Sequence, residues 1–440
     1  MSDKNHCNKN HCNKNHCNKN HCNKNHCNKY HVMSHDNYHY IPANVETVQW
    51  GFFYKNLEPV VYINSGDTAK IEVITHHAGD EYNLMIHSDK NVKKIYNWTE
   101  YCKSLNRRGA GDIKNINPGA GEGKGVHIVT GPVWVNNAEP GDILKVEIID
   151  IIPRPCKNKE YEGRYFGSNL AAWWGYQYGQ LLTEPKKREV VTIYEIFPGK
   201  NKCQPIYNYR YKPQTDPNGV LHDIYNYPGV INKDKDKNYN IKPLNIDLRP
   251  HFGVIGVTPN NESLVNSIPP SLYGGNIDNW RAGVGSTIYL PVQVPGAKFI
   301  VGDSHACQGD SELCGTAVEF SMTGVFKFTL IKKDNNPFTN INCPIIETET
   351  EWVIQGLSYP DYLNQLGPNA QEEIFGKSTI DSAMKDAYLK TNIFLMTYYG
   401  LSEDEAISTM SVGVDFGVTQ VVDGNWGVHA IIKKSIFNKN

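Results

Sequence analysis

Three short polar segments of this chain concentrate the side chains that can do chemistry. They are residues 125–132, 274–279 and 302–315. The third segment is the densest in ionisable groups, and it is too polar and too rich in Gly for a core strand although strongly apolar runs flank it. We therefore predict a loop held by a rigid scaffold, which is where binding and catalytic residues usually lie.

Two histidines and one aspartate from these segments have the chemistry of a metal site. His127, Asp278 and His305 would together provide two neutral imidazoles and one carboxylate. This ligand set suits a divalent metal, Zn above all, and leaves coordination positions for water and substrate. Any one of the three residues alone is more often an ordinary packed or surface residue.

Two glutamates close to His305 are candidates for moving protons. Glu312 or Glu319 would take a proton from water and pass it to a leaving nitrogen. The two residues are seven positions apart, so in a fully extended segment their side chains would point to opposite faces, and we expect only one to serve. Asn276 and the loop amides near Gly309 are candidates for stabilising an oxyanion.

Other interpretations of the same segments stay open. A thiolate at Cys314, beside Glu312, would provide a nucleophile as in thiol amidases, although a buried Cys is usually a small apolar residue. His76 and His77 are consecutive, so in a strand at most one of them can join a given site. A non-catalytic β protein that binds small amides, with a structural metal, is the third alternative.

Familiar catalytic and nucleotide-binding motifs do not fit the chain. Residues 119–125 read GAGEGKG, but a P-loop needs Ser or Thr after the Lys, then a helix, and here Gly125 and a strand-like run follow. The chain contains neither a Gly-x-Ser-x-Gly elbow nor a His-Glu-x-x-His motif. These patterns exclude the usual serine-hydrolase and zincin routes.

The elements that must position these residues are mostly strands. Short β-branched runs ended by Gly, Pro, Asn or Asp occupy residues 68–75, 126–135, 143–152, 190–197, 286–294 and 316–331. Regular helices between strands are missing from the pattern, so we predict a mainly β fold with antiparallel sheets packed as a sandwich or barrel.

The C-terminal part has a different pattern. An apolar stripe predicts a helix over 378–399, with Gly400 at its end. Ser402 and Glu405 form a capping box for a second helix over 403–411, and strands are expected at 417–422 and 427–432. This portion is therefore predicted to be α+β.

The amino-acid composition separates an N-terminal tail from the rest of the chain. The 440 residues carry 44 basic and 46 acidic side chains, but the repeat Asn-His-Cys-Asn-Lys fills residues 5–29. A period of five fits neither helix nor strand, so we expect residues 1–40 to be a disordered tail with no assigned role, although its His and Cys could bind soft metals. The predicted body comprises an N-terminal β domain at 41–155, a central β region at 156–345 with a low-complexity insertion at 200–242, and the α+β portion at 346–440.

Charge and hydropathy bear on partners and location. Without residues 1–29 the chain has 38 basic and 45 acidic side chains, which argues against a nucleic-acid partner. We find no secretory signal, no run of 18 apolar residues and no disulfide framework among the scattered cysteines. We therefore expect a cytoplasmic protein without a membrane partner.

The quoted segments resemble the acetamidase/formamidase family over most of residues 45–434. The matching stretches include GAGEGKGVHIVTGPVWV (119–135), YGGNIDNW (273–280), STIYLPVQVPGAKFIVGDSHACQGDSELCGTAVE (286–319) and EDEAISTMSVGVDFGVTQVVDGNWGVHAIIKK (403–434). The resemblance implies a β-rich fold, a homo-oligomer, hydrolysis of formamide or acetamide to ammonia and the carboxylate, and a divalent metal near His127, Asp278 and His305. The tail, the loop at 81–118, the insertion at 200–242, and Ser311 where Gly is expected depart from the family pattern.

Overall fold

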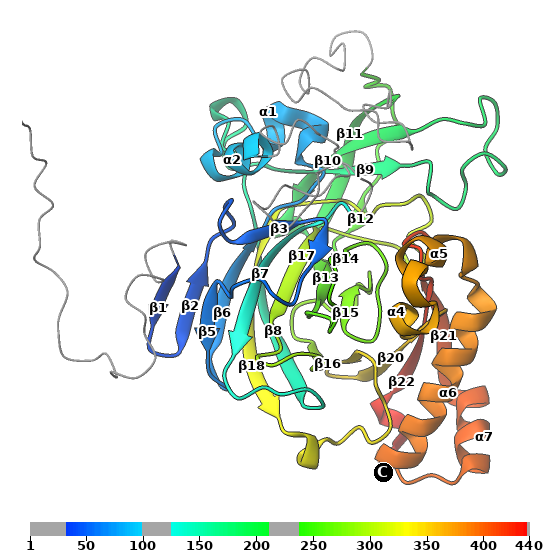
Figure 1. The fold of residues 1–440 in the computed structure, drawn as a ribbon. Coiled ribbons are helices and arrows are strands. Elements are labelled where there is room, and N and C mark those ends of the chain that lie inside the picture. Colours follow the sequence, from blue (N-terminus) through cyan, green and yellow to red (C-terminus); the bar gives the residue numbers. More distant parts are fainter. Residues whose placement is uncertain (1–31, 99–124, 211–236, 438–440) are drawn as a thin grey trace, which may run out of the picture.

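A computed structural model describes residues 32–98, 125–210 and 237–437 (Figure 1). The largest sheet has ten strands. In spatial order they are β1 (Met33–His35), β2 (Tyr38–Ile41), β6 (Thr68–Val73), β18 (Met322–Ile331), β8 (Ile143–Pro153), β16 (Thr287–Pro291), β19 (Ile345–Glu347), β20 (Glu351–Leu357), β22 (Gly427–Lys433) and β21 (Val414–Gln420). All neighbours pair antiparallel except β2 and β6, which are parallel.

A second sheet carries most of the site. Its path is β15 (Gly274–Asn276), β13 (His251–Val257), β17 (Phe299–His305), β7 (Ile128–Val135) and β3 (Val48–Trp50), and β5 (Val61–Ile63) also pairs with β7. Aromatic rings join this sheet to the ten-stranded one, since Phe252 lies 5.2 Å from Phe326 and Phe299 lies 5.0 Å from Phe328, measured between ring centroids. The main apolar core fills the space between the two sheets, as in a sandwich.

Smaller elements complete the fold. Four strands form a third sheet, β12 (Ile246–Asp247), β11 (Lys202–Arg210), β10 (Val190–Phe197) and β9 (Tyr165–Ala171), and β14 (Val265–Asn266) pairs with β4 (Phe52–Phe53). The helices are α1 (Tyr82–Met85), α2 (Lys90–Trp98), α4 (Tyr362–Gln365), α5 (Ala370–Lys377), α6 (Ile380–Tyr398) and α7 (Glu403–Gly413). Short 3-10 helices include η1 (Ala78–Glu81) and η8 (Lys434–Phe437).

The predicted fold class is confirmed. The structure is mainly β with antiparallel sheets, and α6 and α7 form a helical part beside β20–β22 (Figure 1). The Ser402–Glu405 capping box is present at the start of α7. Gly356 in β20 lies where an added Cβ would be 2.3 Å from the Ala387 backbone nitrogen, so a side chain there would push α6 off the sheet.

One prediction about the third polar segment is wrong. Residues 302–305 are not loop but the end of β17, which is buried along its whole length and pairs with β13 and β7. Polar residues can occupy this central strand because their side chains interact with one another inside the site. The predicted strand at 316–331 starts only at Met322.

The structure also bears on the predicted bounds of the tail, the loop, the insertion and the body segments. Strand β1 and the first three residues of β2 lie within the last part of the predicted tail, while residues 1–31 lie outside the described residues. The 81–118 loop contains α1 and α2 as far as it is described, and β11 occupies the described start of the 200–242 insertion. Strands from all three predicted body segments share the ten-stranded sheet, so these segments form one framework.

Among the described residues, no helix is long and apolar enough to cross a membrane.

Candidate active site

The site lies where four strands end side by side. Asp303 and His305 are on β17, two positions apart, and His305 pairs in register with His251 of β13. His127 immediately precedes β7, and His76 follows β6 after two residues. Residues two apart on a strand share a face, so β17 presents Asp303 and His305 together. This arrangement brings side chains far apart in the sequence to one buried location.

The first cluster contains His76, His127 and Asp303. One ligand atom from each lies within 4.8 Å of the others. His76 Nδ1 is 3.6 Å from Asp303 Oδ1, and His127 Nε2 is 3.7 Å from Asp303 Oδ2. The other ring nitrogen of His127, Nδ1, is 3.0 Å from the Ser267 hydroxyl, so Nε2 is the atom directed at the cluster. His77 instead contacts Asp80, with Nδ1 3.0 Å from Oδ2.

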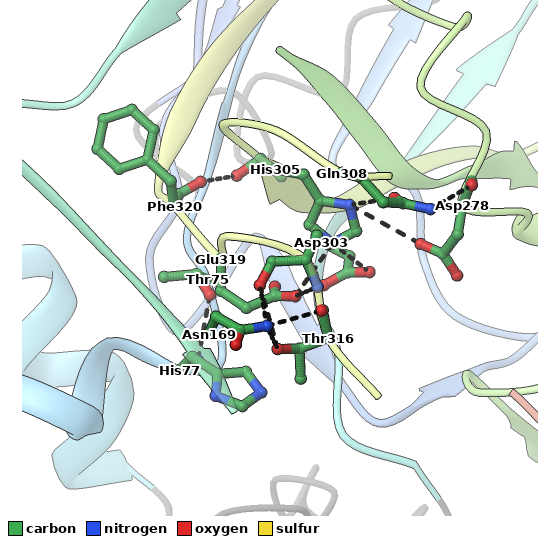
Figure 2. A network of polar contacts seen from close by, with 12 residues as sticks. Thr75, His77, Asn169, Asp278, Asp303, His305, Gln308, Thr316, Glu319 and Phe320 are labelled. Atoms are coloured by element: carbon green, nitrogen blue, oxygen red, sulfur yellow. Dashed lines mark hydrogen bonds and ion pairs between the residues drawn. The ribbon is translucent and has the colours of Figure 1, made fainter. Parts of the chain in front are cut away.

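The second cluster shares Asp303 with the first. Asp303, His305 and Glu319 again have ligand atoms within 4.8 Å of one another. His305 Nε2 lies 3.2 Å from Asp303 Oδ2 and 3.3 Å from Glu319 Oε1, as Figure 2 shows. Asp303 therefore stands between two groups of metal-capable side chains.

A third group lies on the other side of the His305 ring. It contains Asp278, His305 and Glu312, with Asp278 Oδ1 3.9 Å from His305 Nδ1. The same nitrogen is 3.1 Å from Gln308 Oε1, and Gln308 donates from Nε2 to the Asp278 backbone carbonyl at 2.7 Å (Figure 2). Gln308 thus ties the Asp278 loop to the His305 ring.

The site is crowded with buried carboxyl groups. Five of them, on Asp278, Asp303, Glu312, Glu319 and Asp423, are each at most 7% exposed. Among the residues that the structure describes, no Lys or Arg forms an ion pair with any of the five. Asp303 Oδ1, His305 Nε2 and Glu319 Oε2 are buried without a hydrogen bond. Buried charges need compensation, so this donor set fits a cation.

Burial and neighbouring charges shift the pKa values of these groups in different directions. Burial opposes charge on Asp303, but the rings of His305 and His127 outweigh it and hold the Asp303 pKa well below its usual range. Burial would also lower the His305 pKa, but Glu319 and Asp303 raise it well above its usual range. Burial, followed by the Asp303 carboxylate, raises the pKa of Asp278 to about 7. Metal-free, the site therefore holds an Asp303–His305 ion pair beside a carboxyl group that titrates near neutrality.

This titration predicts how the metal-free protein responds to pH. The folded-state pKa of Asp278 is about 7 against an ordinary 3.8, so between these values the folded state binds more protons than the unfolded chain. Stability then falls as pH rises through this window. We expect the unfolding temperature of chelator-stripped protein to drop from pH 5 to pH 7.5, and to drop less in Asp278→Asn.

The control for this experiment is Asp310→Asn. The Asp310 carboxylate pairs with Arg281 at 3.1 Å, and although burial opposes its charge, Arg281 lowers its pKa, so its contribution changes only in more acidic solution. Asp310→Asn should keep the wild-type slope between pH 5 and pH 7.5. An Asp278→Asn protein with that same slope would contradict the assignment.

The predicted metal ligands are divided between the clusters. His127 belongs to the first cluster, whereas Asp278 and His305 belong to the third, and Asp303 connects the two sides. Glu312 and Glu319 each belong to a cluster that contains His305, although in a fully extended segment they would point to opposite faces. The segment between them is not extended, because Glu312 and Gly315 have left-handed φ values of 46° and 107°. Asn276 is buried on β15, two residues before Asp278.

Several residues of the site were missed or undervalued from the sequence. The sequence analysis proposes none of Asp303, His251 and Asp423. Asp423 is buried at the site, where burial and then Asp278 raise its pKa well above the ordinary value. The spacing of Asp303 and His305 was the available signal, since two polar residues at i and i+2 on a strand share a face. His251 and Asp423 lie in apolar runs that give no such signal.

Cys314 has an environment that does not favour a nucleophile. Its Sγ accepts from Asn169 Nδ2 at 3.1 Å and donates to the Thr316 carbonyl at 3.6 Å. Within the described part of the chain, no imidazole lies within hydrogen-bond distance of this sulfur, and Cys314 is in none of the three clusters. A thiol route would therefore lack an adjacent general base.

The fold and the site define a β-sandwich protein with a buried histidine–carboxylate centre. The model of the acetamidase/formamidase family matches residues 106–267 and 261–439, so the chain belongs to this family. It is 29% identical over 212 residues to the acetamidase of Mycolicibacterium smegmatis, covering 43% of this chain and 50% of that protein. It is 24% identical over 326 residues to the formamidase of Methylophilus methylotrophus, covering 68% and 74% of the two chains.

Solved structures agree on the fold. The crystal structure of an acetamidase from Bacillus halodurans aligns with a TM-score of 0.59 at 22% identity, covering 90% of this chain and 98% of that chain. An acetamidase from Yersinia enterocolitica gives the same TM-score at 20% identity, covering 91% and 93%. The chain spans only half the length of the M. smegmatis acetamidase that it matches.

Proposed function

We propose that this protein hydrolyses a short linear amide, formamide or acetamide, to ammonia and the carboxylate. Membership of the family supports amide hydrolysis as the class of reaction. The observation that carries the proposal is the convergence of His76, His127 and Asp303 in a buried polar site. A cytoplasmic location and a homo-oligomeric state remain predictions.

We propose His76, His127 and Asp303 as the ligands of a divalent metal, most suitably Zn, in place of the predicted set His127, Asp278 and His305. The separations of 3.6 Å between His76 Nδ1 and Asp303 Oδ1 and 3.7 Å between His127 Nε2 and Asp303 Oδ2 are too long for hydrogen bonds. They are close to the ~3.4 Å between ligand atoms of a tetrahedral site with bonds of about 2.1 Å. When bound there, such a metal would lower the pKa of a water to about 7 and polarise a carbonyl oxygen.

Glu312 is the better candidate for the proton shuttle. Burial, and then the neighbouring Asp278 carboxylate, raise the Glu312 pKa well above its ordinary value, so its carboxylate is a stronger base than that of an ordinary Glu. Glu319 is less free to move, since its Oε1 accepts from the Ala317 backbone at 3.1 Å and faces His305. We therefore assign Glu319 to holding His305 or a cation.

The proposed steps balance without any further reactant. The water oxygen adds to the amide carbonyl carbon while Glu312 accepts the water's proton. Asn276, which is buried on β15 two residues before Asp278, would donate from Nδ2 to the resulting oxyanion. Glu312 then gives its proton to the amide nitrogen, the C–N bond breaks, and ammonia and the carboxylic acid leave. The acid releases its remaining proton to solvent and becomes the carboxylate.

Metal removal tests this proposal directly. Dialysis of the full-length protein against a chelator should abolish ammonia release from formamide and acetamide, and Zn²⁺ should restore it, because water at neutral pH is otherwise a poor nucleophile. An ammonia assay before and after reconstitution gives the readout.

The thiol alternative provides the control. Cys314→Ser should behave like wild type in the same assay, both stripped and reconstituted. Full activity of the metal-free protein, lost in Cys314→Ser, would overturn the metal proposal and favour the thiol. Activity on neither amide in the reconstituted protein would overturn the proposed function itself.

A further inference from the structure

Two cysteines outside the three clusters lie in contact with each other. Cys203 is on β11 and Cys307 follows the end of β17 by two residues, and their sulfur atoms are 3.4 Å apart, both as free thiols. We propose that this pair is a redox modification site, at which hydrogen peroxide joins the two sulfurs in a reversible disulfide that lowers the activity of the site. The effect on activity rests on the proposed function, whereas formation of the bond does not.

The fold brings the two thiols together across 104 positions of the sequence. Cys203 pairs with Ile196 of β10 and with Ile246 of β12, so its backbone is held on both sides. Both side chains belong to the main apolar core, where Cys203 is fully buried and Cys307 is 6% exposed. Bonded sulfurs lie ~2.05 Å apart, so the bond requires an approach of about 1.4 Å. Because Cys307 lies beyond the end of its strand, we expect Cys307 to supply most of this movement.

The surroundings of the pair favour oxidation. The hydrogen bond from the Cys307 thiol lowers the pKa of Cys203, although burial opposes the charge. The thiolate is the reactive form of cysteine, so this contact makes the pair more reactive than two separate buried thiols. Arg249 and Tyr194, whose charges interact with the pair, are partly exposed, so the two sulfurs lie close to solvent.

The modification balances with one molecule of hydrogen peroxide. One sulfur takes an oxygen atom from the peroxide as the O–O bond breaks, which leaves a sulfenic acid and one water. The other sulfur attacks the sulfenic sulfur, the S–O bond breaks, and a second water leaves as the S–S bond forms. The thiols lose two electrons and the peroxide gains them. In the predicted cytoplasmic location such a bond would be transient, since glutathione and thioredoxin reduce it.

Gln308 connects the pair to the site, because it directly follows Cys307 in the chain. Gln308 Oε1 lies 3.1 Å from His305 Nδ1, and Gln308 Nε2 donates to the Asp278 backbone carbonyl at 2.7 Å (Figure 2). Movement of Cys307 toward Cys203 would displace Gln308 and, with it, the Asp278 loop. Misplacing a group of an active site by ~1 Å can cost about 100-fold in rate, so oxidation should lower the activity.

Non-reducing peptide mapping of the full-length protein, oxidised while folded, tests the bond itself. Trypsin releases Cys203 in residues 203–210 and Cys307 in residues 299–327. The second peptide also contains Cys314, so Cys314→Ser is the background in which the link is assigned. Mass spectrometry should find the two peptides joined after peroxide treatment and separated by dithiothreitol. Peroxide-treated protein without this linked peptide would overturn the proposal.

Ammonia release by the Zn-reconstituted protein tests the effect on activity. Peroxide should lower kcat/KM for formamide at least ~10-fold, and dithiothreitol should restore it. Cys203→Ala and Cys307→Ala cannot form the bond, so each should keep its own untreated activity after peroxide. Cys343→Ala is the matched control, because Cys343 is also buried but lies in a different apolar cluster, and this variant should stay sensitive. Thermal unfolding identifies any variant that fails to fold.

The outcomes separate this inference from the proposed function. A linked peptide with unchanged activity would overturn the effect on the site. An equal loss of activity in folded Cys203→Ala and Cys307→Ala would overturn it too, because oxidation elsewhere, including the tail that every variant shares, would then explain the loss. Absence of hydrolysis before oxidation would overturn the proposed function, while the peptide map would still decide whether the pair forms a disulfide.

Discussion

Replacing Asp303 by asparagine should lower kcat/KM for formamide at least ~1000-fold, which corresponds to about 4 kcal/mol of transition-state stabilisation. The carboxylate faces His76 at 3.6 Å, His127 at 3.7 Å and His305 at 3.2 Å, so it contacts every imidazole of the two clusters that contain it. Asparagine keeps the shape but removes the charge that all these donors share. Steady-state ammonia release measures the effect.

The matched control is Asp310→Asn in the same stretch of chain. Its carboxylate is exposed and pairs with Arg281, away from the clusters. We expect activity within about threefold of wild type, because Asp310 contributes no ligand atom to any of the three clusters. If Asp303→Asn retained most of the wild-type rate while bound metal was unchanged, the central role of Asp303 would be refuted.

Much of the fold could be predicted because local pattern and tertiary packing agree. The alternating runs at 143–152 and 190–197 became β8 and β10, and their burial follows the same alternation over most of their length. The second C-terminal helix starts at its predicted capping box. The spatial order of the strands could not be predicted, since β18 lies between β6 and β8 although it follows them by about 170 or more residues.

The site was only partly predictable for a physical reason. A polar, Gly-containing run usually favours a loop, but β17 tolerates Asp303 and His305 because each compensates the other inside the protein. His251 occupies an otherwise apolar strand, and only its pairing with His305 across β13 and β17 reveals its role. Such compensation depends on long-range contacts, which one sequence does not contain.

Gly253→Ala should reduce activity by ~100-fold or more without removing any ligand. A Cβ on Gly253 would lie 2.3 Å from Asp278 Oδ1, 2.5 Å from Asp303 Oδ2 and 2.6 Å from His305 Cε1. The backbone of Gly253 does not have a left-handed φ, so alanine is excluded only by these side chains. Overpacking of this kind typically costs ~1–3 kcal/mol of stability, and here it would also separate the groups that must share a cation.

Gly309→Ala is the corresponding control, since a Cβ there would meet no atom within 4 Å and Gly309 also lacks a left-handed φ. Both variants need a Mn²⁺ titration as well as an ammonia assay. Because Gly253→Ala keeps every donor, a loss of both ion binding and activity would show that the spacing around Asp303 matters, beyond the mere presence of the residues. If Gly253→Ala folds, binds ions like wild type and remains fully active, then the reaction does not depend on the close approach of Asp278, Asp303 and His305.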